Sequence, residues 1–416
     1  MEGDNMKWKD IPKPIKVRLV TSFFNRTVSF AIMPFMALLF VDAFNKVVAG
    51  LFLISTVFLS FFIGLIGGYL ADRFPRKRLL VLSTTATGLM FLAMTISLAV
   101  NQMIAFTIAY AIFTVTSNIG RPAMGAIIID ATTPDNRRAV YAIDYWLINL
   151  SIALGTALGG WLYVSNKLFL FSLLTCTSLL LPVAYHFLLD ESKHVWRKQP
   201  FRSVLTDITN SYRIAWRDRP FVKVVLGSMC ILAAEFSMGS YVAVRLADEF
   251  KTVEVGNLLV NGVRMVSLIS IENTILVVCL TFFIQRLANR FSSRKTLVAG
   301  LTLYLIGYMT VTSANSMTVL LTFIFIATIG ELLYSPTLNA EKANMMPEDK
   351  RGAYSAFAGT SHAGADLISR STIILGAVLA PFMMSIYIGL IVFLGLVLAY
   401  SGLYMKEVVE TKRNVS

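Results

Sequence analysis

The sequence GGYLADRFPRKR occupies residues 67–78 and separates two long apolar runs. A related sequence, QRLANRFSSRK, occupies residues 285–295, about half a chain later. In both, a Leu-Ala-(Asp/Asn)-Arg-Phe core leads into a short basic loop, and six apolar segments separate the two copies. A polar loop that returns after six apolar segments indicates that the chain was built by doubling a six-helix unit.

A second pair of loops repeats in the same order. PDNRR at residues 134–138 precedes Tyr141, and PEDKR at residues 347–351 precedes Tyr354. Each loop follows an apolar run that contains a proline, Pro122 in the first and Pro336 in the second. Two echoes at nearly the same separation argue against a chance match and support the duplication.

The composition is that of an integral membrane protein. Of 416 residues, 56% are hydrophobic and only 15% are charged. The apolar residues fall in runs of about 20, the length that crosses a bilayer. The sequence therefore predicts an all-α membrane protein with 12 transmembrane helices in two six-helix halves, with spans at 17–40, 46–71, 79–99, 102–128, 140–163, 168–189, 221–247, 258–284, 296–313, 317–340, 354–380 and 384–405.

The basic, polar segment 191–220 divides the two predicted halves, 1–190 and 221–416. This segment carries Arg, Asp, Gln and Pro where the rest of the chain has Leu and Phe. Such a change in composition is typical of a linker outside the bilayer. We expect it to be cytoplasmic.

The net charge of +13 does not indicate nucleic-acid binding, because the basic residues gather in alternate loops. Lys and Arg are grouped in the amino-terminal tail, at 73–78, 137–138, 193–223, 286–295 and 350–351, and after 405, whereas the intervening loops carry few. This asymmetry follows the positive-inside rule and predicts a multi-pass protein of the cytoplasmic membrane with both termini in the cytoplasm. We expect the excess charge to contact anionic membrane lipids.

The sequence carries no motif of an enzyme, a cofactor or a metal site. Cys176, Cys230 and Cys279 lie in apolar runs, without the spacing of a disulfide framework or of metal ligands. A phosphate-binding glycine loop and a nucleophile elbow are both missing, so neither ATP-driven pumping nor covalent catalysis is expected. The first 16 residues are polar and charged, and we expect no cleavable signal.

The loop at 67–78 resembles that of the major facilitator superfamily, whose signature there is Gly-x-x-x-Asp-(Arg/Lys)-x-Gly-(Arg/Lys)-(Arg/Lys). Five residues match and Pro75 replaces the second glycine; the matches are Gly68, Asp72, Arg73, Arg76 and Lys77. The resemblance implies a conformational latch, in which an acid at a helix end pairs with bases and helix N-termini of the other half. The alternative is a basic loop that only sets the topology.

The segment from Ile127 to Tyr163 is similar to the LmrP-like multidrug/proton antiporters of that superfamily, and Gly330–Pro336 and Asn261–Met265 extend the similarity. The resemblance implies proton-coupled efflux of lipophilic, often cationic drugs by alternating access, and hence antibiotic resistance, by a protein expected to be monomeric. Two alternatives stay open. One is a proton-coupled transporter of a single metabolite or lipid class, and the other is a membrane scaffold that transports nothing.

Charged residues inside the predicted spans are the candidates for proton coupling, because an ionisable group in the bilayer is costly to keep there. In the first half, Asp144 opens the fifth span and Asp130 ends the fourth, and the resemblance assigns both to the proton path. Arg121, in Arg-Pro-Ala-Met-Gly, resembles the span-four motif Arg-x-x-Gln-Gly and is expected to pair with these acids. Gly155–Gly160 resembles the antiporter motif of the fifth span, although close helix packing suffices to explain its glycines.

In the second half, Glu331 in the tenth span matches the family's carboxylate for cationic substrate and for proton exchange. Asn118, in the first half, matches a family position that lines the same cavity. The resemblance therefore implies that both residues bind substrate. The alternative for Glu331 is a structural ion pair with Arg370.

The family's acid in the seventh span has no counterpart at the aligned position, Gly239. Glu235, one turn earlier, and Glu272, in the eighth span, are both candidates to replace it. Asp366 and Arg370 are spaced i,i+4 with the acid first, which favours a local structural pair.

Overall fold

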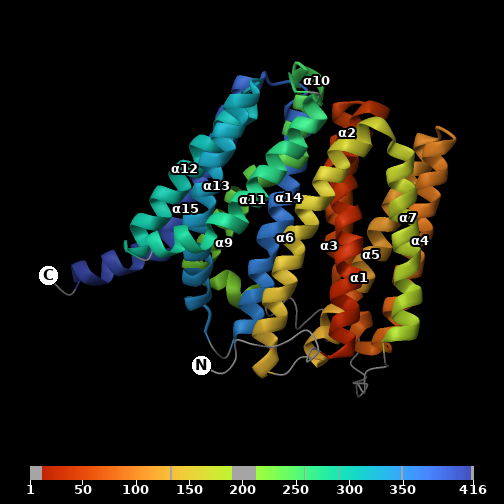
Figure 1. Ribbon diagram of the computed structural model, residues 1–416. Helices are drawn as coiled ribbons and strands as arrows, with labels where there is room; N and C mark the ends of the chain where they lie inside the picture. The colour runs from red at the N-terminus through yellow and green to blue at the C-terminus, as the bar shows by residue number, and fades with distance from the viewer. Residues whose placement is uncertain are drawn as a thin grey trace. The chain divides into compact units, whose positions relative to one another are not determined.

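The computed structural model describes residues 12–131, 134–189, 212–256, 258–288, 290–347 and 350–413. These residues are almost entirely helical (Figure 1). Eleven of the described helices, or pairs of helices in line, are long and apolar enough to cross a membrane. The predicted fold class, an all-α membrane protein, is confirmed.

The chain forms two compact units. The first comprises Met1–Met36 and Ser55–Phe201, and the second comprises Ala37–Ile54 and Arg202–Ser416. The predicted linker at 191–220 lies for the most part outside the described residues, and its last part, 212–217, is helical.

The first unit contains α1 (Lys13–Ile32), η2 (Met33–Phe35), α4 (Arg76–Ala99), α5 (Met103–Ala131), α6 (Pro134–Ser165), α7 (Lys167–Leu188) and most of α3 (Lys46–Arg73). Helix α7 begins where the side chain of Asn166 accepts a hydrogen bond from the backbone N–H of Phe169, an N-cap that satisfies one of the free donors of the first turn. The unit is thus a bundle of spanning helices joined by short turns.

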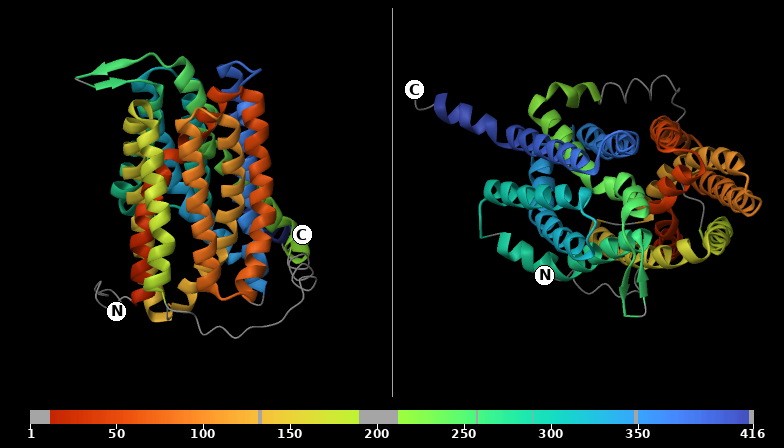
Figure 2. Two further views of the ribbon diagram at one scale, coloured as in Figure 1. Left: turned by 90° about the vertical axis from the view of Figure 1, so that its right-hand side faces the viewer. Right: turned by 90° about the horizontal axis from the view of Figure 1, so that it is seen from above.

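The second unit contains α2 (Met36–Ala43), the start of α3, α9 (Arg219–Phe236), η3 (Ser237–Gly239), α10 (Tyr241–Glu249), α11 (Gly262–Ala288), α12 (Ser293–Ser313), α13 (Met317–Asn344), α14 (Arg351–Leu375) and α15 (Pro381–Arg413). Strands β1 (Val253–Val255) and β2 (Leu258–Val260) pair antiparallel in a hairpin that projects from the helices (Figure 2). Asp218 caps α9 through the N–H of Phe221.

The first span of each predicted half is broken by one turn of 3₁₀-helix. In the first half η2, which contains Pro34, separates α1 from α2, and in the second half η3 separates α9 from α10. Proline has no N–H to donate to the preceding turn, which explains the first break. The two breaks lie at comparable places in the two halves, as the duplication predicts.

Helix α14 occupies the place of the predicted eleventh span but is not among the helices apolar enough to cross a membrane by composition. It carries Asp366, Arg370 and several serines, and Ser361, Ser369 and Thr372 are buried against its neighbours. Polar residues in a spanning helix normally face the protein interior, because lipid offers them no hydrogen bonds. The shortfall of one span therefore reflects the polar composition of α14.

Candidate functional site

Asp144 is brought to α1 by close packing between α6 and α1. A Cβ atom placed on Gly155 would lie 2.3 Å from the carbonyl oxygen of Thr27, and one on Gly159 would lie 2.3 Å from that of Ala31. Only glycine permits this approach, since no side chain separates the two backbones. The glycines of the antiporter-like motif thus have a packing role in this structure.

Two arginines of α1 hold the carboxylate of Asp144. Nη2 of Arg18 donates to Oδ2 at 3.0 Å, and Nη1 of Arg26 donates to Oδ1 at 2.8 Å. The side chain of Asp144 is only 10% exposed. One carboxylate therefore faces two guanidinium groups, one at each of its oxygens.

The sequence predicted neither of these pairs, since it expected Arg121 to serve Asp144. Arg18 was counted with the basic amino-terminal tail, although it lies inside α1 about two turns from Arg26. Arg121 lies on α5 with an exposed side chain, and one turn earlier the buried Asn118 donates to the carbonyl of Thr114 at 2.8 Å.

The remaining candidates of the first unit lie near helix ends. Asp130 lies at the end of α5, and Gly68, Asp72 and Arg73 lie at the end of α3; the side chains of all four are outside the described part of the structure. Arg76 is the first residue of α4 and is buried, and Lys77 follows it. The structure thus places the predicted latch at the junction of α3 and α4, and the latch itself stays a prediction.

In the second unit, a glycine contact between α12 and α13 positions Glu331. A Cβ on Gly300 would lie 2.8 Å from the carbonyl oxygen of Gly330, and one on Gly330 would lie 2.5 Å from the N atom of Tyr304. Glu331 follows Gly330 directly, so the same contact that joins the helices brings this carboxylate beside the tyrosines of α12.

A hydrogen-bond network holds Glu331 from α11. Nδ2 of Asn273 donates to Oε2 of Glu331 at 3.2 Å and to Oγ1 of Thr328 at 2.9 Å. Glu331 and Asn273 thus join α13 to α11. The sequence did not single out Asn273, because a neutral amide in an apolar run gives no charge signal.

Glu235 of α9 interacts electrostatically with Glu331, so the structure brings these two predicted acids together. Three buried tyrosines lie beside them. The ring of Tyr304 contacts those of Tyr308 and Tyr334, with centroids 4.5 and 5.1 Å apart, and its hydroxyl donates to the carbonyl of Ile231 at 3.2 Å. Among the described residues, neither acid forms an ion pair with a basic group. The site therefore holds two carboxyl groups and no permanent cation.

Glu272 and Arg370 take no part in this group. Oε2 of Glu272, on α11, is buried without a hydrogen-bond partner, and its carboxyl has no resolved interaction with Glu331. Arg370 pairs with Asp366 through Nε and Oδ1 at 2.9 Å. The predicted local pair on α14 is confirmed, and Glu331 has no arginine partner in it.

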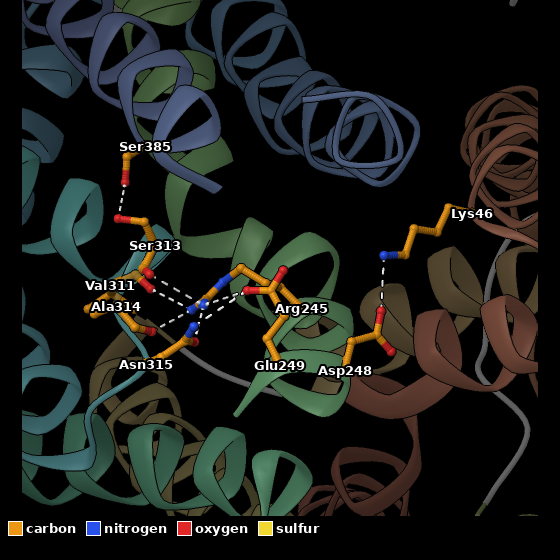
Figure 3. Close-up of polar contacts among 9 residues, drawn as sticks. All are labelled: Lys46, Arg245, Asp248, Glu249, Val311, Ser313, Ala314, Asn315 and Ser385. Atoms are coloured by element: carbon orange, nitrogen blue, oxygen red, sulfur yellow. Dashed lines mark hydrogen bonds and ion pairs between the residues drawn. The ribbon is translucent and has the colours of Figure 1, made fainter. Parts of the chain in front are cut away.

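Arg245 is a buried charge inside the predicted seventh span. It was not counted there among the charged residues of the spans. Its side chain is 2% exposed and donates to the carbonyls of Val311 and Ala314 at the end of α12, to Oδ1 of Asn315, and pairs with Glu249 at 3.6 Å (Figure 3). A cation at a helix C-terminus satisfies carbonyls that have no helical partner. Arg245 therefore fastens α10 to α12.

Next to this cluster, Asp248 of α10 accepts from Nζ of Lys46 at 3.0 Å, and Lys46 is the first residue of α3 (Figure 3). The two side chains are 46% and 36% exposed, respectively. Surface pairs of this kind contribute about 0–1 kcal/mol. In contrast to Arg245, this contact is easily broken.

Comparisons with known proteins agree with this architecture. A peptide transporter, POT, solved in complex with sulfate, superposes with a TM-score of 0.74 at 17% identity, and the match covers 97% of this chain and 96% of that one. A bacterial homologue of the iron transporter ferroportin, in an inward-facing state, gives a TM-score of 0.69 at 16% identity, with 96% and 100% covered. At these identities the likeness shows the fold alone.

Two curated relatives are similar in sequence. A Na⁺, Li⁺, K⁺/H⁺ antiporter of Planococcus maritimus is 26% identical over 85% of this chain and 87% of its own, and an uncharacterized MFS-type transporter of Bacillus subtilis, YqjV, is 23% identical over 86% and 85%. The sequence also matches the Major Facilitator Superfamily over residues 19–366. The chain therefore belongs to the major facilitator superfamily and is a membrane transporter rather than an enzyme.

Proposed function

We propose that the protein is a proton-coupled antiporter of cations and that Glu331 is the carboxylate for which proton and cargo compete. The observation that carries the proposal is the group formed by Glu331, Glu235 and Asn273. Two carboxyl groups that interact without a basic partner repel each other when both are charged, and a bound proton or a bound cation relieves that repulsion. Either occupant is expected to exclude the other.

Asp144 would act differently in the cycle. Arg18 and Arg26 hold its two oxygens, so a role for Asp144 in the cycle requires that these two contacts break or become hydrated. We propose that Asp144, with Asp130, Arg121 and the latch residues, links proton uptake to the change of state. A proton drives such a change only through a difference in affinity between the two states.

The favoured cargo is a small inorganic cation. The acids lie among fully buried tyrosines on tightly packed helices, a setting that suits a compact ion ligated by oxygen atoms. The similarity to an antiporter of Na⁺, Li⁺ and K⁺ over most of both chains supports the same class.

Lipophilic cations are the second candidate, as the sequence resemblance to multidrug antiporters predicts. In the first unit an apolar groove of about 350 Å³ lies between α1 and α6 and is lined by Leu19, Val20, Phe23, Phe24, Ile143, Trp146 and Leu147. Aromatic and aliphatic walls with little polarity tolerate many hydrophobic ligands. Val20, Phe24 and Trp146 are exposed along this groove, which supports a lipophilic cargo of either kind, drug or lipid.

The experiment uses purified protein in proteoliposomes with an acidic interior and an enclosed pH-sensitive dye. Addition of Na⁺, Li⁺ or K⁺ to the outside is expected to make the interior of wild-type vesicles alkaline, and Glu331→Gln is expected to abolish the response. Glu254→Gln, the same substitution on an exposed residue of β1, serves as the control and should respond like wild type.

Each cargo gives a distinct outcome. A response to ethidium but not to alkali cations would replace the first candidate by drug export. An undiminished response in Glu331→Gln would disprove the proposed role of that acid.

The positive-inside pattern further supports a location in the cytoplasmic membrane with both termini in the cytoplasm.

A further inference from the structure

A chain of hydrogen bonds starts on the backbone of α13 and ends on Glu331. Oγ1 of Thr328 donates to the carbonyl of Ile324 at 2.8 Å, Nδ2 of Asn273 donates to Oγ1 of Thr328 at 2.9 Å, and the same Nδ2 donates to Oε2 of Glu331 at 3.2 Å. The three side chains come from one turn of α13 and the facing turn of α11.

The chain has a fixed direction. A threonine hydroxyl has a single hydrogen, and Thr328 donates it to Ile324, so toward Asn273 this hydroxyl only accepts. Asn273 must then present its amide nitrogen, whose two hydrogens serve Thr328 and Glu331. If the amide were reversed, its oxygen would face two acceptors. Thr328 thus sets the orientation of the amide that faces Glu331.

The two oxygens of Glu331 therefore differ. Oε2 accepts a hydrogen bond from the fixed amide of Asn273. A proton bound at Oε2 would compete with that hydrogen bond. The exchange of proton and cation is then directed to Oε1. A hydrogen bond to a charged carboxylate is roughly twice as strong as one to the neutral acid, so the donor favours the charged, cation-binding form.

We propose that Asn273 is a positioning residue that holds one oxygen of Glu331 and thereby sets the balance between proton and cation at the other. This inference rests on the proposed function of Glu331. Asn273 is the one side chain that donates to Glu331 among the described residues.

Among the described residues, the other groups that face Glu331 are one acid and three neutral tyrosines. Glu235 faces it from α9, Tyr304 and Tyr308 from α12, and Tyr334 from its own helix. None of them carries a positive charge. Removal of the Asn273 amide therefore leaves this carboxylate without a hydrogen-bond donor among the described side chains.

The test measures the pH dependence of cation-driven proton release in the same proteoliposomes, with Na⁺, Li⁺ and K⁺ as probes. In Asn273→Ala the profile is expected to shift by about one pH unit toward alkaline pH, with an increase of about ten-fold in the KM for the cation, the effect of losing one hydrogen bond to a charged group. Thr328→Val should shift the profile in the same direction but by less, because the amide loses its anchor and not its donor. Thr328→Ser, which keeps the hydroxyl, should behave like wild type.

A purely structural role would lower the yield or the Tm of Asn273→Ala without moving the profile, and that result would overturn the inference. Should Asn273→Ala fail to fold, Thr328→Val against Thr328→Ser gives the same readout. Infrared titration of the carboxyl band that disappears in Glu331→Gln measures the protonation of Glu331 without transport. If Asn273→Ala leaves that titration unchanged while Glu331→Gln abolishes exchange, the inference is wrong and the proposed function stands. If exchange survives in Glu331→Gln, the proposed function is wrong, and the titration still decides whether Asn273 holds Glu331.

Discussion

The acid of the first unit and the acids of the second are surrounded by opposite electrostatics. Asp144 accepts hydrogen bonds from Arg18 and Arg26, two permanent cations. Glu331 accepts from the neutral Asn273 and interacts with a second acid, Glu235. The duplicated chain has thus built one carboxylate that two arginines hold and one pair of acids that has no basic partner among the described residues. The position of an acid in a span does not reveal which of the two it will be, because its neighbours come from other helices.

The largest effect is expected when the second site is made to resemble the first. Asn273→Lys puts a permanent cation beside Glu331, and a bound ammonium group should exclude both proton and cargo. We expect cation-driven proton release to fall by about 100-fold, the equivalent of a stable ion pair in a poorly hydrated site. The rate of cation-driven proton release from proteoliposomes measures this decrease.

Asn273→Met is the matched control, since methionine is close to lysine in length and carries no charge. It removes the donor alone, so it should keep exchange with a shifted pH profile. If both variants lose exchange equally, crowding of the site and not charge is responsible, and the contrast between the two sites would lose its explanation.

The second effect concerns stability, and here one site should be destabilised while the other is unchanged. Asp144→Asn leaves Arg18 and Arg26 without their partner in a site that is mostly buried, which is expected to cost about 3–5 kcal/mol. Glu331→Gln removes no ion pair, and its amide oxygen can still accept from Asn273, so its stability should match that of wild type. Thermal unfolding in detergent compares the two.

The triple variant Asp144→Asn, Arg18→Gln, Arg26→Gln serves as the control for Asp144→Asn. Because no charge is left unpaired, its Tm should recover most of the decrease that Asp144→Asn causes. A Tm for Asp144→Asn equal to that of wild type would show that the arginine pairs are not what holds this site together.

The smallest effect is expected from the helix contact that brings Asp144 to its arginines. Gly155→Ala puts a methyl group 2.3 Å from the carbonyl of Thr27, and overpacking of this kind costs about 1–3 kcal/mol. The expected outcome is a lower Tm. Gly64→Ala in α3, where no atom lies within 4 Å of the added methyl, is the control and should be neutral or slightly stabilising. Equal effects of the two changes would mean that α6 and α1 adjust freely.

The sequence predicted the fold well because bilayer thickness fixes the length of an apolar run, and a run of about 20 residues can be read without knowing its neighbours. It also identified Glu331 and Glu235, since acids in apolar runs stand out. It did not predict that Arg18 and Arg26 serve Asp144, because that pairing depends on the glycine contact between α6 and α1, whose residues lie far apart in the chain. Asn273 was missed because a neutral amide in an apolar run gives no charge signal, and its proposed role depends on the direction of a hydrogen-bond chain.

Helix α3 belongs to both units, since the boundary between them falls within it, between Ile54 and Ser55. Release of the first turns of α3 from α10 would break the ion pair of Lys46 with Asp248. Because that pair is half exposed and weak, its rupture would add little to the activation barrier of a turnover. The buried contacts of Arg245 would keep α10 attached to α12, so that the ion pair with Lys46 can form again.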